Sequence, residues 1–201
     1  MRLFLFSFVF VAVTCSAAEQ VKEPPPGLVL VARASGLTEK GAGQARPLRV
    51  NDSVPVGRLI QTDHTSGSGA VLVFSNGAVL SLSAATALRI ETFTQQPFAA
   101  TVTIADMTME PSVSQARITI LRGEVIGLVR GLRAANGSVF AIKAGAREVN
   151  VDRCSFSARL MAGTDRAEIK VVRSGEKSDP EWENTLEERL LVPAFGAGSR
   201  K

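Results

Sequence analysis

This chain has very few of the side chains on which common catalytic and binding sites depend. It contains one histidine, two cysteines, one tryptophan and no tyrosine, and aromatic residues make up 5% of the sequence. A zinc site needs several nitrogen, sulfur or carboxylate ligands, and His64 and Cys154 lie far apart in the sequence. Exposed aromatic rings are the usual platforms for sugars and single-stranded nucleic acids. The composition therefore argues against these kinds of site.

Long apolar runs are also missing, except at the N-terminus. Arg2 precedes the apolar residues 3–13, and Ser16, Ala17 and Ala18 offer small residues for cleavage before residue 19. The apolar run is shorter than the roughly 20 residues that span a bilayer. This pattern predicts a signal peptide over residues 1–18, and hence a periplasmic or secreted bacterial protein with no later membrane span.

Two alternatives to a cleaved signal peptide remain. The apolar run could be kept as an N-terminal anchor, or Cys15 could be acylated as in a lipoprotein. Thr14 is bulkier than the small residue that usually precedes such a cysteine, which disfavours acylation. Cleavage would leave Cys154 as the one cysteine, so no internal disulfide would form and the core must hold the fold. We expect Cys154 to be a buried structural thiol.

Charge is spread along the sequence rather than concentrated. The net charge is +4 and the calculated pI about 9.5. Seven arginines alternate with apolar residues, as on the outward faces of strands: Arg117, Arg122, Arg130, Arg133, Arg147, Arg153 and Arg159. Nucleic-acid binders gather such charge on one stripe, so we expect a solvated face and no nucleic-acid partner.

The length suits one domain with a sizeable core. We expect a proline-rich linker over residues 19–27, a β domain over residues 28–176, and a helix or edge segment with a disordered tail over residues 177–201.

Alternating apolar residues predict the strands, most clearly around Asn76-Gly77. This dipeptide lies between two apolar segments and suits a two-residue type I′ turn. A third strand follows, with Leu88 and Ile90 facing inward. A second Asn-Gly pair, Asn136-Gly137, is expected to form another hairpin turn before residues 138–142.

Further strands are predicted over residues 28–32, 56–62, 118–129 and 169–172, and less clearly over 101–104. Glycines at 123 and 127 indicate bulges or close backbone approach. The glycine-rich residues 36–43 are expected to form a loop. The apolar residues are odd-numbered at Val149 and Val151 but even-numbered at 156, 158 and 160, so an unbroken strand would point them to opposite faces. A bulge or turn at Asp152-Arg153 would bring them to the same face.

The C-terminal region favours a short helix over residues 182–190, started by Pro180. Residues 190–192 could instead form an edge strand. The expected fold class is therefore all-β, an antiparallel sandwich or rolled β-structure of short strands with a short C-terminal helix.

Candidate chemistry is sparse. Asp63, His64, Thr65 and Ser66 bring an acid, an imidazole and hydroxyls together, but sequence neighbours rarely form a catalytic relay. The carboxylate pairs, Glu187 with Glu188 and Asp106 with Glu110, are typical of surface charge rather than of a glycosidase pair. Met107 and Met109 suit core packing or an exposed flap. We expect no catalytic residue, no cofactor and no metal site.

The hairpin and the later glycine-containing strands resemble a FecR domain. The resemblance covers roughly residues 56–172. Its residues are Leu72-Val73-Phe74-Ser75-Asn76-Gly77-Ala78-Val79, Ala85-Thr86-Ala87-Leu88-Arg89-Ile90, Glu110-Pro111-Ser112-Val113-Ser114, Leu121-Arg122-Gly123-Glu124-Val125-Ile126-Gly127 and Ser138-Val139-Phe140-Ala141-Ile142.

The chain departs from that family at residues 143–154. FecR domains usually carry a Thr-Pro-x-Gly segment and an Arg-Gly-Thr motif there, and both are missing although Gly145 is present. The family's membrane-anchored regulator joins a periplasmic domain to a cytoplasmic sigma-factor-binding region. The resemblance extends only to the exported module, so it does not imply sigma-factor control.

The sequence thus predicts an exported, non-catalytic binding or assembly module of the bacterial envelope. Its partner would be another envelope protein or a glycan, recognised through strand edges and loops. The alternatives are an enzyme acting on envelope glycans and a structural module without a specific ligand.

Overall fold

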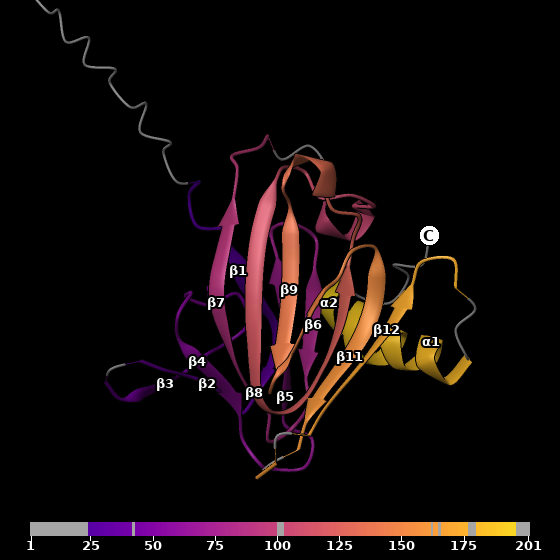
Figure 1. The fold of residues 1–201 in the computed structure, drawn as a ribbon. Coiled ribbons are helices and arrows are strands. Elements are labelled where there is room, and N and C mark those ends of the chain that lie inside the picture. The colour runs from indigo at the N-terminus through magenta and orange to yellow at the C-terminus, as the bar shows by residue number, and fades with distance from the viewer. Residues whose placement is uncertain are drawn as a thin grey trace, which may run out of the picture.

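The computed structural model describes residues 24–41, 43–99, 103–161, 163–164, 166–176 and 180–195. The predicted signal peptide lies outside them. Figure 1 shows a curled sheet with the C-terminal helices against one of its faces. The strands are β1 (Val29–Ser35), β2 (Leu37–Lys40), β3 (Ala45–Pro47), β4 (Leu59–Thr62), β5 (Gly69–Phe74), β6 (Val79–Leu82), β7 (Ala87–Gln95), β8 (Ser114–Val129), β9 (Val139–Ala144), β10 (Arg147–Asn150), β11 (Cys154–Leu160) and β12 (Ala167–Arg173).

The helical elements of the described residues are short. They are η1 (Ile104–Asp106), η2 (Ala134–Asn136), α1 (Pro180–Leu186), η3 (Glu187–Leu191) and α2 (Val192–Phe195). Most strand pairs are antiparallel, so the predicted all-β class with a short C-terminal helix is confirmed.

The long strand β8 belongs to two halves of the sheet. Its first half lies between β7 and β9, and its second half between β6 and β11. The change falls at Gly123, which has φ +81, and a Cβ there would lie 2.6 Å from Cα of Thr86. We call the order β10-β9-β8-β7-β4-β2-β3 sheet A and the order β1-β5-β6-β8-β11-β12 sheet B. A glycine is needed at this position because the strand turns from one sheet into the other.

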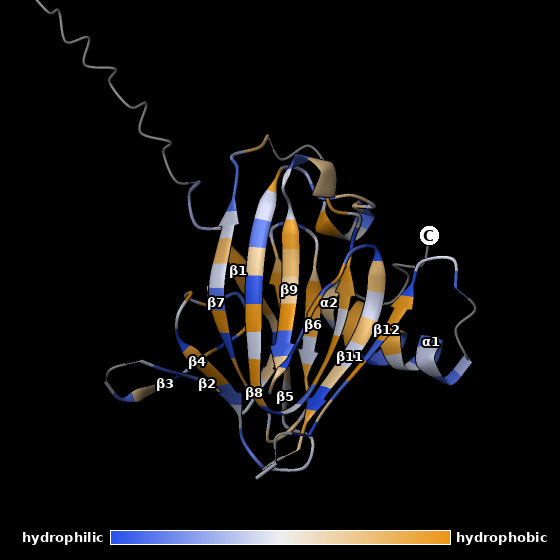
Figure 2. Ribbon diagram, in the orientation of Figure 1, coloured by the Kyte–Doolittle hydropathy of each residue, from blue (hydrophilic) through white to orange (hydrophobic). Residues whose placement is uncertain are grey.

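One main core lies between the two sheets. In several strands, β7 among them, the residues that face it are apolar and alternate with more polar ones, which Figure 2 shows as bands of colour along the strands. In sheet B, β5 and β6 are buried on both faces. Phe74 of sheet B meets the rings of Phe93 and Phe140 of sheet A edge-on, at 5.1 and 5.7 Å between centroids. Leu88 and Ile90 are fully buried, as their alternation predicted.

The Asn76-Gly77 hairpin is present, but its turn is not type I′. The N–H of Gly77 donates to the carbonyl of Phe74, and only Gly77 has a positive φ. This geometry matches a three-residue loop with a type I turn and a glycine bulge. Asn76 is buried, and its side chain accepts from the N–H of Ala78 and donates to Ser114. These side-chain bonds favour the wider loop.

The second Asn-Gly pair does not form a hairpin. Residues 134–136 form η2, and Gly137 ends it at φ 93. The next strand, β9, then pairs with the first half of β8 in parallel. The prediction failed because the same dipeptide also suits the end of a helical turn.

Two local predictions were wrong. Residues 37–40 of the expected glycine-rich loop form β2, which pairs with β3 and β4. Ile104, placed in a tentative strand, belongs to η1, while residues 101–102 lie outside the described part.

The predicted irregularity at Asp152-Arg153 is present between two strands. β10 ends at Asn150, β11 begins at Cys154, and Arg153 between them has φ 45. The end of the predicted linker is attached to β7, because the N–H of Gly27 donates to the carbonyl of Phe93 at 2.8 Å.

The C-terminal segment covers the outer face of sheet B. Trp182 and Leu190 pack with Val73 and Ile126 in a second apolar cluster. Arg189 donates to Glu124 at 3.2 Å and to Ser83 at 2.6 Å. The alternative of an edge strand at residues 190–192 is therefore wrong, since these residues are helical.

Candidate functional site

The residues around His64 form a surface turn. The carboxylate of Asp63 accepts hydrogen bonds from the hydroxyl of Ser68 and from the N–H of Thr65. The Ser68 bond is the main reason why the pKa of Asp63 is lowered, followed by the Thr65 bond. His64 itself is exposed. The acid of this cluster thus orders a turn by binding local donors.

The expectation of surface charge holds for Asp106 and Glu188 but is wrong for Glu110. Glu110 is 1% exposed and accepts from the Ser114 hydroxyl at 2.5 Å and from the N–H of Arg133 at 2.6 Å. Asp106 is exposed and accepts from Thr103. Glu110 therefore joins β8 to the segment before β9, a role that a buried carboxylate can fill only with such donors.

Cys154 is buried at the start of β11, as predicted. Burial raises the pKa of its thiol to about 11. The thiol is therefore neutral at ordinary pH and is a poor nucleophile.

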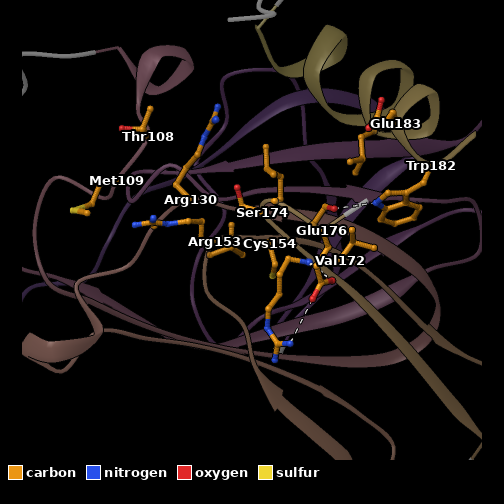
Figure 3. A pocket seen from close by; sticks show the side chains of 17 residues that line it. Thr108, Met109, Arg130, Arg153, Cys154, Val172, Ser174, Glu176, Trp182 and Glu183 are labelled. Atoms are coloured by element: carbon orange, nitrogen blue, oxygen red, sulfur yellow. Dashed lines mark hydrogen bonds and ion pairs between the residues drawn. The ribbon is translucent and has the colours of Figure 1, made fainter. Parts of the chain in front are cut away.

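Cys154 lies beside an open cavity of about 570 Å³ between sheet B and α1. The cavity is bounded by the ends of β8, β11 and β12, by residues 108–109 and by α1. Its size falls within the range of roughly 300–1,000 Å³ that small-molecule sites occupy. Figure 3 shows the side chains that line it.

One end of the cavity is basic. Arg130 follows β8 and Arg153 precedes β11, and the N–H of Arg153 donates to the carbonyl of Arg130 at 3.4 Å. Figure 3 shows both side chains on the same side of the view. Burial lowers the pKa of Arg130. Among the described residues, Arg153 has no hydrogen bond or ion pair from its side chain, whereas Arg173 nearby pairs with Glu176 at 3.7 Å.

The other end of the cavity is mainly apolar. Leu128, Val172, Trp182 and Leu186 line it. The indole N–H of Trp182 donates to the hydroxyl of Ser155 at 2.9 Å, which fixes the ring over sheet B. Lys170 of β12 lies over the same ring, 5.3 Å from its centroid. The cavity thus joins a cationic end to a rigid apolar wall.

The strand beside this cavity, β12, is an edge of sheet B. Within the described residues it pairs with β11 alone, over all seven of its residues. Ala167, Ile169 and Val171 pack toward the main core, and Glu168 and Lys170 are exposed. Every second residue of such a strand directs its N–H and C=O away from the paired neighbour.

The other strand edges are shorter or covered. β3 has three residues and β10 has four. The outer edge of β1 is bridged by Ser53 opposite Leu30, and its N–H at Val31 donates to Asp52. In the described part of the chain, β12 is therefore the longest open edge.

Neither the family models, nor the curated proteins, nor the solved structures match this chain. No helix in the described ranges is long and apolar enough to cross a bilayer. No group of three metal-binding side chains occurs among the same residues.

Sequence reasoning missed the cavity. Arg130 and Arg153 were assigned to a solvated face, and Trp182 to a terminal helix, because each lies in a different segment. The one local signal was the predicted turn at Asp152-Arg153, which places an arginine at the end of a strand.

Proposed function

We propose that this protein is an exported, non-catalytic binding module of the bacterial envelope. In this proposal it recognises an extended segment of another envelope protein, which adds to β12 as a further strand. The predicted N-terminal export signal and the resemblance to the exported FecR module support the location and the class. The observation that carries the mechanism is the open edge of β12.

The residues of β12 favour pairing with particular partner segments over pairing with any exposed strand. Main-chain hydrogen bonds give affinity in β-augmentation, and side-chain positions give specificity. The exposed Glu168 and Lys170 put opposite charges on β12, and charged residues on an edge discourage pairing with arbitrary strands. A partner segment with complementary charges would be accepted.

A photoreactive residue placed on β12 tests this mechanism. We expect a photoreactive phenylalanine analogue at Glu168 to form one discrete adduct in cells that export the protein. The matched control carries the analogue at Arg147, an exposed residue of the short edge strand β10. We expect no adduct from the control, since a four-residue strand offers too few outward main-chain groups.

Mass spectrometry of the adduct identifies the cross-linked protein and the segment that contacts position 168. Mapping to one extended segment of one envelope protein supports strand addition. Equal adducts at both positions, or none at Glu168 with the protein folded and exported, would contradict it.

A further inference from the structure

The basic end of the cavity holds a guanidinium that is exposed and unengaged. Arg153 is exposed, and within the described part of the chain nothing accepts a hydrogen bond from its side chain. Its φ of 45 places it in the left-handed region, which a non-glycine residue seldom adopts. The backbone bond to Arg130 holds the two residues next to each other at this end of the cavity, while Figure 3 shows their side chains extending in different directions.

An exposed arginine without a side-chain partner suits an oxyanion. A guanidinium offers several N–H donors in a fixed plane that matches carboxylate and phosphate oxygens. Arg130 lines the same end of the cavity and adds a second positive charge there. Thr108 also borders this end and supplies a hydroxyl.

The remaining wall is unsuited to a purely polar ligand. Leu128, Val172 and Leu186 present aliphatic surface, and Trp182 closes it. Apolar area removed from water contributes about 25 cal/mol per Å². Glu183 lies on the α1 side of the cavity, which directs a negative group toward the arginines.

We propose that the cavity between sheet B and α1 binds an anionic amphiphile, with its carboxylate or phosphate at Arg153, near the positive charge of Arg130, and its aliphatic chain against Leu128, Val172 and Leu186. This site uses side chains inside the cavity and not the main-chain edge of β12. The two proposals are therefore independent, and a test of one does not decide the other.

Intrinsic fluorescence can report binding directly at this site. Trp182 is the one tryptophan of the chain, and the chain has no tyrosine. The purified protein is titrated with decanoate, decyl phosphate, decanol and inorganic phosphate, each below the concentration at which it forms micelles or separates. We expect saturable changes in Trp182 emission with decanoate and decyl phosphate. Decanol tests the need for the charge, and inorganic phosphate tests the need for the chain.

The decisive variant is Arg153→Ala. Hydrogen bonds to charged groups contribute about 1.5–3 kcal/mol, so we expect Kd for both anionic amphiphiles to rise at least about tenfold. The matched control is Arg159→Ala, which removes the same charge from an exposed position of β11 outside the cavity lining. We expect its Kd values to equal those of the unchanged protein. Neither change alters a described ion pair, so both variants should fold.

The pattern of results decides the proposal. Tighter binding of decanoate or of decyl phosphate identifies a carboxylate or a phosphate headgroup, and either supports it. Four results overturn it: no saturable change with either anion, decanol binding as tightly as decanoate, inorganic phosphate binding as tightly as decyl phosphate, or unchanged binding by Arg153→Ala.

Discussion

Replacing Phe74 with alanine is expected to lower the free energy of unfolding by about 3–5 kcal/mol. Phe74 is fully buried and belongs to sheet B, while Phe93 and Phe140, which its ring contacts edge-on, belong to sheet A. Truncation removes a large apolar side chain and leaves a cavity that both sheets line. The strand β8 joins the two sheets through the backbone, and these ring contacts join them through the core.

Urea unfolding followed by circular dichroism measures this loss. The control is Phe98→Ala, which removes the same side chain from a position that is 37% exposed, and we expect a change within about 0.5 kcal/mol. If Phe74→Ala does not fold, Phe74→Leu should still fold with a smaller loss. Equal stabilities for Phe74→Ala and Phe98→Ala would show that the sheets are not joined through this ring.

Gly127→Ala is expected to cost about 3 kcal/mol, the upper part of the range for overpacked cores. Gly127 lies in β8 between β6 and β11, opposite Leu80 and Phe156. A Cβ there would overlap the ring of Phe156 and lie 2.9 Å from Cδ2 of Leu80. Since Gly127 does not have a positive φ, the cost is steric and not conformational.

A double variant isolates that steric cost. Adding Phe156→Leu should recover part of the stability lost by Gly127→Ala, so the two changes should be less than additive. Gly43→Ala is the control, because a Cβ there meets nothing within 4 Å. Additive losses in the double variant would mean that Phe156 is not the obstacle.

Local alternation was enough to predict most strands and the fold class. The apolar positions of β7 and β11 face the core because strand side chains alternate with period two. The turn at Asp152-Arg153 was predicted because a change of parity within one buried face requires an irregularity.

Pairing over long sequence distances could not be predicted in this way. β8 pairs with four other strands, and β9 joins it in parallel after η2. No residue near Asn136 indicates in the sequence that the following strand pairs in parallel with β8. Likewise, residues 37–40 form a strand because β4 is available to pair with them, despite the glycines on either side.

The candidate site could not be predicted either, because its residues are far apart in the sequence. Arg130, Arg153 and Trp182 come together only when β8, β11 and α1 are placed side by side. Burial of Cys154 was predictable, since a lone cysteine in an apolar strand behaves as a small apolar residue.

Amide hydrogen exchange of the protein with and without its cross-linked partner segment tests the central claim most directly. If that segment adds to β12, the outward N–H groups of residues 167–173 gain hydrogen bonds and exchange more slowly in the complex. The account predicts slowed exchange along β12 and unchanged exchange along β10. Protection elsewhere, with β12 exchanging as in the free protein, would contradict it.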